Sequence, residues 1–378
     1  MMDCIIVGGG VSGMFAAITA AGQGKKVLIL EKNDCLGKKI LITGNGRCNF
    51  TNEIVNPLFY SSEDNAKGHA FADKVLSECG NDKLLEMMSE LGMSFYVREG
   101  YYYPKTDEAV TFRDTLINEI NRLGIEVVYN YNLRSIKRTD SGFELSDKNN
   151  IYHGKKVILA MGGKAAPKTG SSGDAYYYLE GLGHKIIPPL PALTTLKTDY
   201  PTSLQGVNAL ADITLLIDDE RIATEHGFIK YYKGMLSGIP IYQLSTRTAK
   251  AFNGKCKVEI LVDFLADTNI DKAISRGLDE RNALYQSINP KIVDAYYEEG
   301  NIQLFSSVKY EIIGYGDYNS AQCTSGGVDI NEINPDTMES KVCPGLYITG
   351  ELMDITGRCG GYNIQWAFST GVIAGSNI

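Results

Sequence analysis

The sequence predicts an α/β protein whose parallel-sheet domain is split by an inserted antiparallel β-barrel domain and a small helical cap. A strand, glycine-rich turn, helix and strand open the chain over residues 3–31. A second apolar strand and a glycine-led helix close it over residues 346–375. Between about residues 194 and 263, short β-rich runs replace this alternation, which is typical of an antiparallel insert.

The N-terminal element carries a dinucleotide-binding pattern. Its turn reads G-x-G-x-x-G at Gly8, Gly10 and Gly13, with Val11 and Ser12 between the last two glycines. The glycines permit a tight turn, close approach of a pyrophosphate and close packing of the helix on the strand. The turn therefore predicts a phosphate site at the start of a helix, where backbone amides face the anion.

The flanking residues extend this prediction to a whole nucleotide. Residues 3–7 and 26–30 are apolar runs of strand length, and residues 14–21 form the predicted helix. Glu31 and Lys32 follow the second strand, and the Glu31 carboxylate can accept hydrogen bonds from a ribose. Because a carboxylate there repels a 2′-phosphate, the pattern predicts FAD or NAD rather than NADP.

Residues 37–52 (GKKILITGNGRCNFTN) form a loop rich in glycine, asparagine and arginine. Such a loop offers amides and a guanidinium, which suit phosphates or the edge of a flavin. A solvated surface turn is the alternative, and the apolar residues 40–42 disfavour it. The candidate ligands from this loop are Lys38, Asn45, Gly46, Arg47, Cys48 and Asn49.

The middle of the first domain alternates helices and strands. Residues 66–92 and 109–123 are predicted helices, and the predicted strands are 101–104, 127–129, 133–136, 142–145 and 156–161. The last strand ends at Gly162-Gly163, where the backbone, with Ala160, can pass beneath a long cofactor. By analogy with similar folds, the adenine is expected near Leu133.

The insert begins after a proline-rich segment, residues 188–191, interpreted as a rigid linker. Its predicted elements are strands at 213–217, 228–232, 240–244, 257–262 and 302–313, with a helical, polar segment at 267–297. The resulting domain division is a FAD-binding domain at 1–193 and 321–378, a β-barrel-like domain at 194–265 and 302–320, and a helical insert at 266–301.

The C-terminal stretch supplies a second candidate half-site. After strand 346–348 come Gly350 and Glu351, then a loop with Asp354, Arg358 and Cys359, and then Gly360-Gly361 at a helix start. Two bare glycines leave the first helical amides uncovered, which suits an anionic or carbonyl-rich ligand. The alternative is a turn before an ordinary helix. The candidate ligands here are Gly350, Glu351, Asp354, Gly360, Gly361, Tyr362, Asn363 and Gln365.

Composition narrows the classes of function. The 378 residues carry a net charge of −8, which disfavours a nucleic-acid partner. Eight cysteines without a C-x-x-C pair and four separated histidines predict no metal site. The absence of a long apolar run or a basic leader predicts a cytoplasmic protein with no membrane partner. A redox pair of Cys48 and Cys359 is a minor hypothesis, because buried cysteines are usually inert.

Three glycine pairs or triplets far apart in the sequence suit an extended FAD better than a compact NAD site. The chain then resembles the BaiN-like (aminoacetone-oxidase-like) FAD-binding proteins of the glutathione-reductase-like superfamily. The matching stretches are VGGGVSGMFAAITAA, LEKNDCLGKKILITGNGRCNFTN, ILAMGGKAAPKTGSSGDAY and CPGLYITGELMDITGRCGGYNIQWAFSTG. This resemblance implies non-covalent FAD, a split Rossmann-like domain, an inserted β-barrel and a small helical insert.

The resemblance implies a FAD-dependent oxidoreductase with a small-molecule substrate. The leading hypothesis is reduction of a conjugated C=C bond in a bile-acid-like or steroid-like enone, with NADH or NADPH as a transient electron donor. Oxidation of a small amine, such as an aminoketone, is the alternative. A flavin-dependent RNA-modifying enzyme and a non-catalytic flavoprotein are alternatives of other classes. The catalytic acid stays open among Tyr101, Tyr102 and Tyr362.

Overall fold

The computed structural model describes all residues, 1–378, as two compact units. The first comprises residues 1–189 and 323–378, and the second comprises residues 190–322. The chain therefore leaves the first unit once and returns to it. Each unit has a hydrophobic core of its own.

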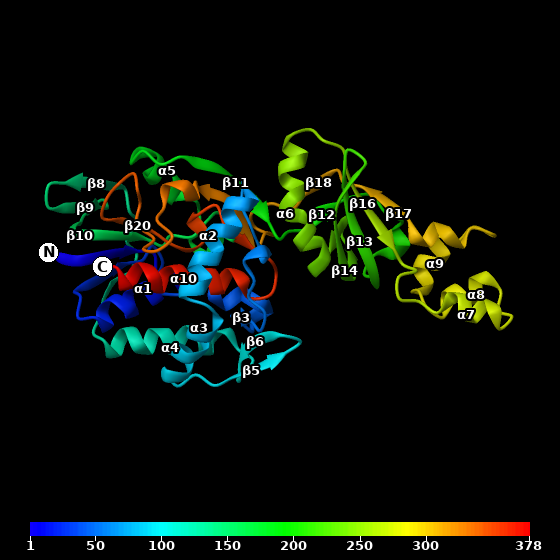
Figure 1. The fold of residues 1–378 in the computed structure, drawn as a ribbon, viewed down its shortest axis with the longest axis horizontal. Coiled ribbons are helices and arrows are strands. Elements are labelled where there is room, and N and C mark those ends of the chain that lie inside the picture. The colour runs from blue at the N-terminus through cyan, green and yellow to red at the C-terminus, as the bar shows by residue number, and fades with distance from the viewer. The chain divides into compact units, whose positions relative to one another are not determined.

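The first unit is built on a mostly parallel sheet (Figure 1). Its parallel strands, in spatial order, are β7 (Glu126–Val128), β2 (Val27–Leu30), β1 (Met2–Val7), β10 (Ile151–Leu159) and β20 (Leu346–Ile348). An antiparallel hairpin of β8 (Ser135–Thr139) and β9 (Gly142–Ser146) pairs with the first half of β10. Burial on both faces explains the continuous apolar runs of β1 and β2.

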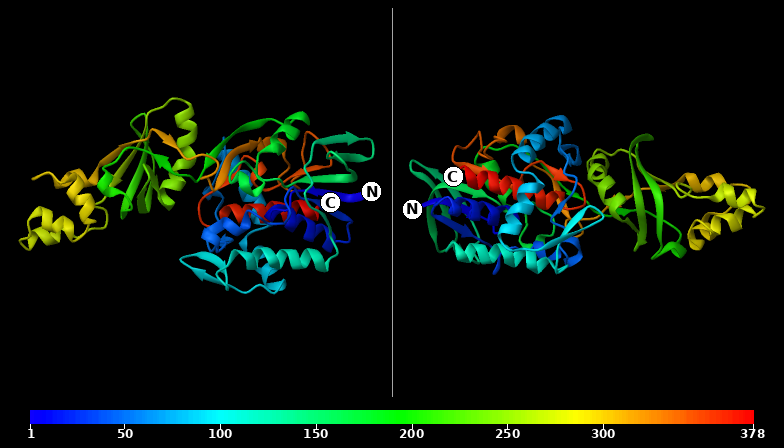
Figure 2. Two further views of the ribbon diagram at one scale, coloured as in Figure 1. Left: turned by 180° about the vertical axis from the view of Figure 1, so that it is seen from behind. Right: turned by 60° about the horizontal axis from the view of Figure 1, so that its bottom comes forward.

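The helices of this unit are α1 (Val11–Gly22), α2 (Asn65–Glu78), α3 (Asn81–Glu90), α4 (Ala109–Arg122), α5 (Asp174–Gly181) and α10 (Tyr362–Ser376). In both views of Figure 2, α1 and α10 run side by side although they come from opposite ends of the chain. The single helix expected over residues 66–92 is interrupted at Cys79 and Gly80, so it forms two helices.

Smaller sheets complete the first unit. They are β3 (Thr51–Asn52) with β6 (Tyr101–Pro104) and β5 (Phe95–Arg98), β4 (Tyr60–Ser61) with β21 (Thr356–Gly357), and β11 (Ile186–Ala192) with β19 (Cys323–Val328). Residues 190–192 of β11 already belong to the second unit. The proline-rich residues 188–191, interpreted from sequence as a linker, are part of strand β11. This correction has a simple reason, because proline is compatible with a strand whose N–H groups need no partner on that side.

The second unit is an antiparallel sheet of seven strands in the order β17, β16, β13, β14, β15, β12 and β18. Their bounds are Val308–Glu311, Val258–Asp263, Asn208–Ile217, Glu220–Tyr232, Met235–Ser237, Leu196–Lys197 and Gly314–Tyr315. The hydrogen-bonded path is open from β17 to β18, so closure into a barrel stays a prediction. Three short helices, α7 (Ile270–Ser275), α8 (Glu280–Tyr285) and α9 (Pro290–Tyr296), occupy the segment predicted to be helical.

Two strand predictions in this unit are wrong. Residues 240–244 belong to helix α6 (Ile239–Asn253), because Gly238 and Pro240 start a helix and the buried positions Pro240, Ile241, Leu244 and Thr248 follow helical spacing. Residues 302–306 form a short 3-10 helix, and only residues 308–311 of the expected strand pair with the sheet. A short apolar run does not distinguish these alternatives by periodicity.

Candidate functional site

The three glycines of the first turn have different surroundings. A Cβ atom on Gly8 would lie 2.4 Å from the carbonyl oxygen of Ala160, and one on Gly13 would lie 1.9 Å from that of Gly8. Gly8 also has a φ of +104°, which favours glycine. Around Gly10, in contrast, a Cβ atom would meet nothing within 4 Å. The turn therefore packs tightly on the protein side and is open at the glycine expected to face the pyrophosphate.

Glu31 lies buried at the end of β2 and holds this turn in place. Its Oε2 atom accepts a hydrogen bond from the Gly9 amide at 2.6 Å, and its Oε1 atom accepts bonds from the backbone and side-chain nitrogens of Asn33, both at 2.7 Å. Each carboxylate oxygen has two lone pairs, so Oε2 retains capacity for a ribose hydroxyl. Val11 and Ser12 stand in the first turn of α1, whose leading amides have no intrahelical acceptor.

Thr324, Lys39 and Glu351 meet at the end of β10. A Cβ on Gly163 would lie 2.4 Å from Thr324 Oγ1 and 2.7 Å from Glu351 Oε1. The Glu351 carboxylate accepts bonds from the Thr324 amide at 2.9 Å and from Lys39 Nζ at 2.7 Å. Lys39 was missed from the sequence, where Lys38 and Lys39 are equivalent, and only the fold shows which lysine reaches the glutamate.

The loop of residues 37–52 and the start of α10 lie against each other. Gly361, with φ +90°, is the N-cap of α10, and a Cβ on it would lie 2.6 Å from Asn49 Oδ1 and 2.7 Å from Thr51 N. The buried Asn49 Oδ1 atom has no hydrogen-bond partner, and the amides of Tyr362 and Asn363 have none either. Unpaired N–H donors beside an unpaired carbonyl-type acceptor complement the C2=O and N3–H edge of a flavin. The residues present therefore fit FAD.

Several candidate ligands have protein partners instead. On α10, the Asn363 side chain hydrogen-bonds both backbone groups of Gly357, the Gln365 side chain hydrogen-bonds Thr51 and Ser369, and the Tyr362 hydroxyl donates to the Ile54 carbonyl. Before α10, the Asp354 carboxylate accepts a bond from the Glu63 amide, and the Gly350 amide donates to the Thr370 hydroxyl. Lys32 forms an ion pair with Asp174 at 2.7 Å, so each of these groups has a structural role within the protein. The proposed contacts of Lys32, Asp354, Tyr362, Asn363 and Gln365 with a cofactor stay predictions.

The remaining candidates lie in the glycine-rich loop and on the main sheet. Asn45, Gly46 and Cys48 have positive φ angles of 55°, 85° and 58°, and the Arg47 guanidinium lies 5.7 Å from the centre of the Tyr103 ring. Lys38 is half-buried, Gly162 has a φ of +70°, and Leu133 and Ala160 are buried. Burial raises the pKa of the Cys48 thiol to about 12, so this thiol is protonated near neutral pH. This protonation weakens the hypothesis of a redox pair with Cys359, because the thiolate is the reactive form.

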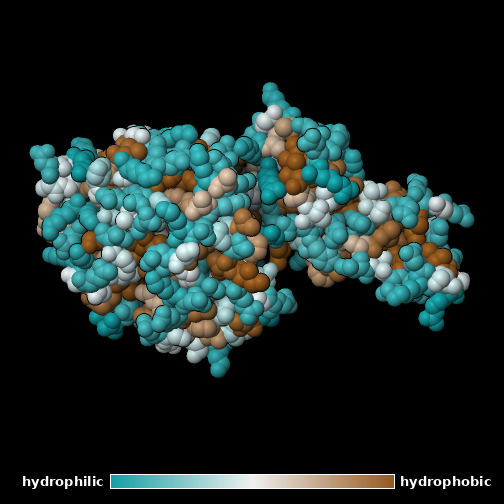
Figure 3. Space-filling model, in the orientation of Figure 1, coloured by the Kyte–Doolittle hydropathy of each residue, from teal (hydrophilic) through white to brown (hydrophobic).

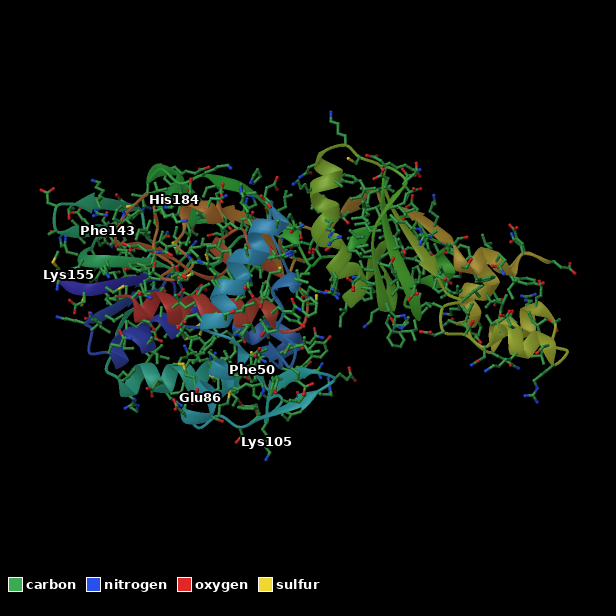
Figure 4. The ribbon with its side chains drawn as sticks, viewed as in Figure 1. Phe50, Glu86, Lys105, Phe143, Lys155 and His184 are labelled. Carbon is green, nitrogen blue, oxygen red and sulfur yellow. The ribbon has the colours of Figure 1, made fainter.

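A Ser–His–Glu arrangement, unnoticed in the sequence, surrounds His184, which Figure 4 labels near α5. His184 Nδ1 lies 2.8 Å from Glu332 Oε2, and His184 Nε2 lies 2.8 Å from Ser340 Oγ. Both His184 and Ser340 are buried, and Ser340 Oγ accepts bonds from the Val342 and Cys343 amides. Because Ser340 Oγ already makes these hydrogen bonds, it stabilises its own loop and does not act as a nucleophile toward a substrate. Within residues 1–378, no group of His, Cys, Asp and Glu is arranged to hold a metal.

Glu31→Ala is expected to weaken FAD binding by about 1.5–3 kcal/mol, through loss of hydrogen bonds to a charged group. The Gly9 and Asn33 nitrogens would also lose their acceptor, so the apoprotein should lose about 1–3 kcal/mol of unfolding free energy. Titration with FAD measures the loss of affinity, and urea denaturation of the apoprotein measures the loss of unfolding free energy. Removal of the exposed carboxylate of Glu180 is the control, and an unchanged FAD affinity for Glu31→Ala would mean that Glu31 does not face the ribose.

Asp354 makes the stability of the apoprotein depend on pH. Burial raises the pKa of this carboxyl from 3.8 to about 6, against the stabilising Glu63 N–H bond. The folded protein therefore holds this proton more tightly, and the contribution of Asp354 to the unfolding free energy falls as pH rises from about 4 to about 6. At 1.36 kcal/mol per pKa unit the fall is at most about 3 kcal/mol. Asp354→Asn should remove this slope in urea denaturation at several pH values, and parallel curves for parent and variant would contradict it.

None of the helices combines the length and apolar composition that crossing a bilayer requires. On the face drawn in Figure 3, hydrophilic residues predominate and apolar residues occur in scattered patches. Isolated apolar residues on a surface are normal and indicate no particular partner.

Known proteins resemble this chain along almost its whole length. It is 34% identical to the 3-dehydro-bile acid delta(4,6)-reductase of Clostridium scindens, over 98% of this chain and 97% of that protein. It is 28% identical to the ribosomal RNA dihydrouridine synthase of Escherichia coli, over 97% and 96% of the two chains. The structure of 3-ketosteroid-delta4-(5alpha)-dehydrogenase from Rhodococcus jostii RHA1 matches with a TM-score of 0.52 and 13% identity, covering 100% and 96% of the two chains, which shows a common fold.

The family assignment follows from a further match along nearly the whole chain. The profile of the HI0933-like protein Rossmann domain family aligns with residues 2–377, from the first strand to the end of α10. That span includes both glycine-led helix starts and the inserted unit between them. The chain therefore belongs to the HI0933-like family, and its first unit has the Rossmann-type fold of FAD-dependent oxidoreductases.

Proposed function

We propose that the protein is a FAD-dependent oxidoreductase that reduces a C=C bond conjugated to a carbonyl group, with a steroid-like or bile-acid-like enone as the favoured substrate. The structural observation that carries this proposal is the pair of glycine-led helix starts, α1 and α10, within one unit. Both leave backbone amides without an acceptor, and one faces open space at Gly10. A long ligand with an anionic centre and a carbonyl-rich end matches this pair.

Different residues would bind different parts of such a cofactor. Gly10, Val11 and Ser12 would bind the pyrophosphate, Glu31 the ribose, and the amides that follow Gly361 the carbonyl edge of the flavin. FAD supplies two-electron redox chemistry when it is bound. The protein contributes the positive end of α10, which favours negative charge at that edge.

The names of the similar proteins support the proposal that the protein reduces a C=C bond conjugated to a carbonyl group. The relative from Clostridium scindens is named as a bile-acid reductase, and that from Escherichia coli as a dihydrouridine synthase. Dihydrouridine is uridine with its C5=C6 bond saturated, and this bond is conjugated to the C4 carbonyl. Both names thus describe saturation of a C=C bond next to a carbonyl, on substrates of different size. This shared bond type is the basis on which we assign reduction, with oxidation of an aminoketone as the alternative.

The higher identity, 34% against 28%, and the net charge of −8 favour a small steroid-like enone over RNA. Ribosomal RNA is the second candidate substrate, supported by the E. coli relative. The electron donor is proposed to be NADH or NADPH. The sequence has no second G-x-G-x-x-G turn, so a nicotinamide would bind only transiently.

The test starts with mass spectrometry of the cofactor released by heat, for which we expect FAD. Anaerobic mixing with NADH or NADPH should then bleach the flavin, and 4-androstene-3,17-dione should restore its colour with formation of the saturated ketone. Oxygen consumption with an aminoketone and no enone reduction would replace the proposal with an oxidase. Dihydrouridine formed in ribosomal RNA, with no enone reduction, would identify RNA as the substrate.

A further inference from the structure

Tyr101 presents a hydroxyl group beside the glycine-led start of α10. It is the first residue of β6 and pairs with Asn52 of β3, whose side-chain Nδ2 donates to the Gly360 carbonyl at 3.3 Å. A Cβ on Gly360 would lie 2.6 Å from Tyr101 Cε1, so the ring packs directly on this glycine. The absence of a side chain at residue 360 thus admits the tyrosine to the site where we place the flavin edge.

The other two candidate acids, Tyr362 and Tyr102, make contacts with the protein itself. Tyr362 donates its hydroxyl proton to the Ile54 carbonyl at 3.1 Å. Tyr102 points to the other face of β6, as strand alternation requires, and its ring packs near those of Phe50 and Phe95, with centroids 6.2 and 5.8 Å away. The half-buried Tyr101 hydroxyl makes no hydrogen bond to the protein.

The surroundings keep the Tyr101 phenol protonated. Partial burial raises its pKa above the usual value of 10, and Cys359 acts in the same direction. The nearby Arg358 cation opposes this shift and would stabilise the phenolate that forms when the proton leaves. A group that is protonated at neutral pH and has a cation beside its conjugate base meets the requirements of a general acid.

We propose that Tyr101 donates the proton to the α carbon of the conjugated substrate, an inference that rests on the proposed reductase function. The substrate would gain a hydride, carrying two electrons, at its β carbon from bound reduced FAD, which would thereby be oxidised. Its C=C π bond breaks and two C–H bonds form. The O–H bond of Tyr101 breaks to supply the second hydrogen as a proton, and the phenolate then takes a proton from water.

The experiment compares the parent holoenzyme with Tyr101→Phe and the matched neighbour Tyr102→Phe. Each is reduced anaerobically with dithionite, which removes any dependence on a nicotinamide donor, and mixed with 4-androstene-3,17-dione while flavin reoxidation is followed. Tyr101→Phe should slow this step about 10²- to 10⁴-fold, as expected for loss of a general acid. Tyr102→Phe should match the parent. A 3-fluorotyrosine at position 101, which keeps an acidic hydroxyl, should restore the rate.

FAD occupancy and the affinity of the oxidised enzyme for the steroid, both read from the flavin spectrum, separate proton donation from support of the fold. Both should be unchanged in Tyr101→Phe, and the parent reaction in heavy water should place deuterium at the α carbon. Equal rates for the parent and Tyr101→Phe, or a loss of FAD that explains the slower rate, would overturn the role of Tyr101 alone. A parent that reduces no conjugated alkene would overturn the proposed function and the role of Tyr101 together.

Discussion

Gly13→Ala should prevent the first unit from folding stably, whereas Gly10→Ala should leave the fold intact and abolish tight FAD binding. A Cβ on residue 13 would stand 1.9 Å from the Gly8 carbonyl oxygen and 3.2 Å from the Ala160 methyl group, and neither neighbour is the end of a flexible side chain that could move away. A Cβ on residue 10 would enter open space, at a φ of −78° that alanine adopts without strain. Both substitutions add one methyl group, at positions three residues apart. Any difference between the two variants therefore reports the different surroundings of that methyl group.

For Gly13→Ala we expect a loss of unfolding free energy of about 3 kcal/mol or more, at the upper end of overpacking in a well-packed core. Urea denaturation of the apoprotein measures this loss, and titration with FAD measures the effect at Gly10. Gly22→Ala, at the end of the same helix and with nothing within 4 Å, is the control and should change neither quantity appreciably. Normal FAD affinity in Gly10→Ala would show that the pyrophosphate does not pass over this glycine.

Gly371→Val should force apart the two helices that join the ends of the chain. A Cβ on Gly371 of α10 would lie 2.4 Å from the Ser12 carbonyl oxygen of α1, and one on Gly375 would lie 2.5 Å from that of Ala16. One turn of helix separates the two glycines, so together they form a flat strip on which the α1 backbone rests. Adding side-chain volume there should cost about 3 kcal/mol or more.

The smaller substitution Gly371→Ala gives a sharper test, because the two possible outcomes differ in the sign of the change in unfolding free energy. In an unconstrained helix, replacing glycine with alanine stabilises by up to about 1 kcal/mol, because alanine has the higher helix propensity. Gly371→Ala should instead destabilise the protein, since even one methyl group meets the α1 backbone. Circular dichroism during urea denaturation distinguishes the two signs, and a stabilised Gly371→Ala protein would contradict close packing of α1 and α10.

The same kind of geometry bears on Gly361. The sequence alone predicts that a valine at this position pushes the flavin away or disturbs the helix start. The structure places Asn49 and Thr51 against the Gly361 Cα, so the new side chain would first collide with the protein's own chain. Loss of FAD in such a variant would therefore report a damaged helix start as well as a lost contact. Tyr101 and Gly10 are better positions from which to probe the cofactor and the substrate.

The sequence by itself determined the parallel core and the N-terminal turn, because the signals for both are local. The apolar runs of β1 and β2, the spacing of Gly8, Gly10 and Gly13, and the position of Glu31 all lie within about thirty residues. Helix and strand lengths in the insert were less certain, since a five-residue apolar run such as 240–244 suits either element. There Gly238 and Pro240, rather than hydrophobicity, decided for a helix.

Tertiary structure alone decided which of several equivalent side chains reach the site. Lys39 rather than Lys38 meets Glu351, Tyr101 rather than Tyr102 faces Gly360, and Asn49 meets Gly361 across more than three hundred residues. Sequence spacing carries no information about such contacts, because they depend on the face of a strand or loop that turns toward a distant segment. The physical reason is that pairing of β10 with β1 and β20, and packing of α1 on α10, bring the two ends of the chain together.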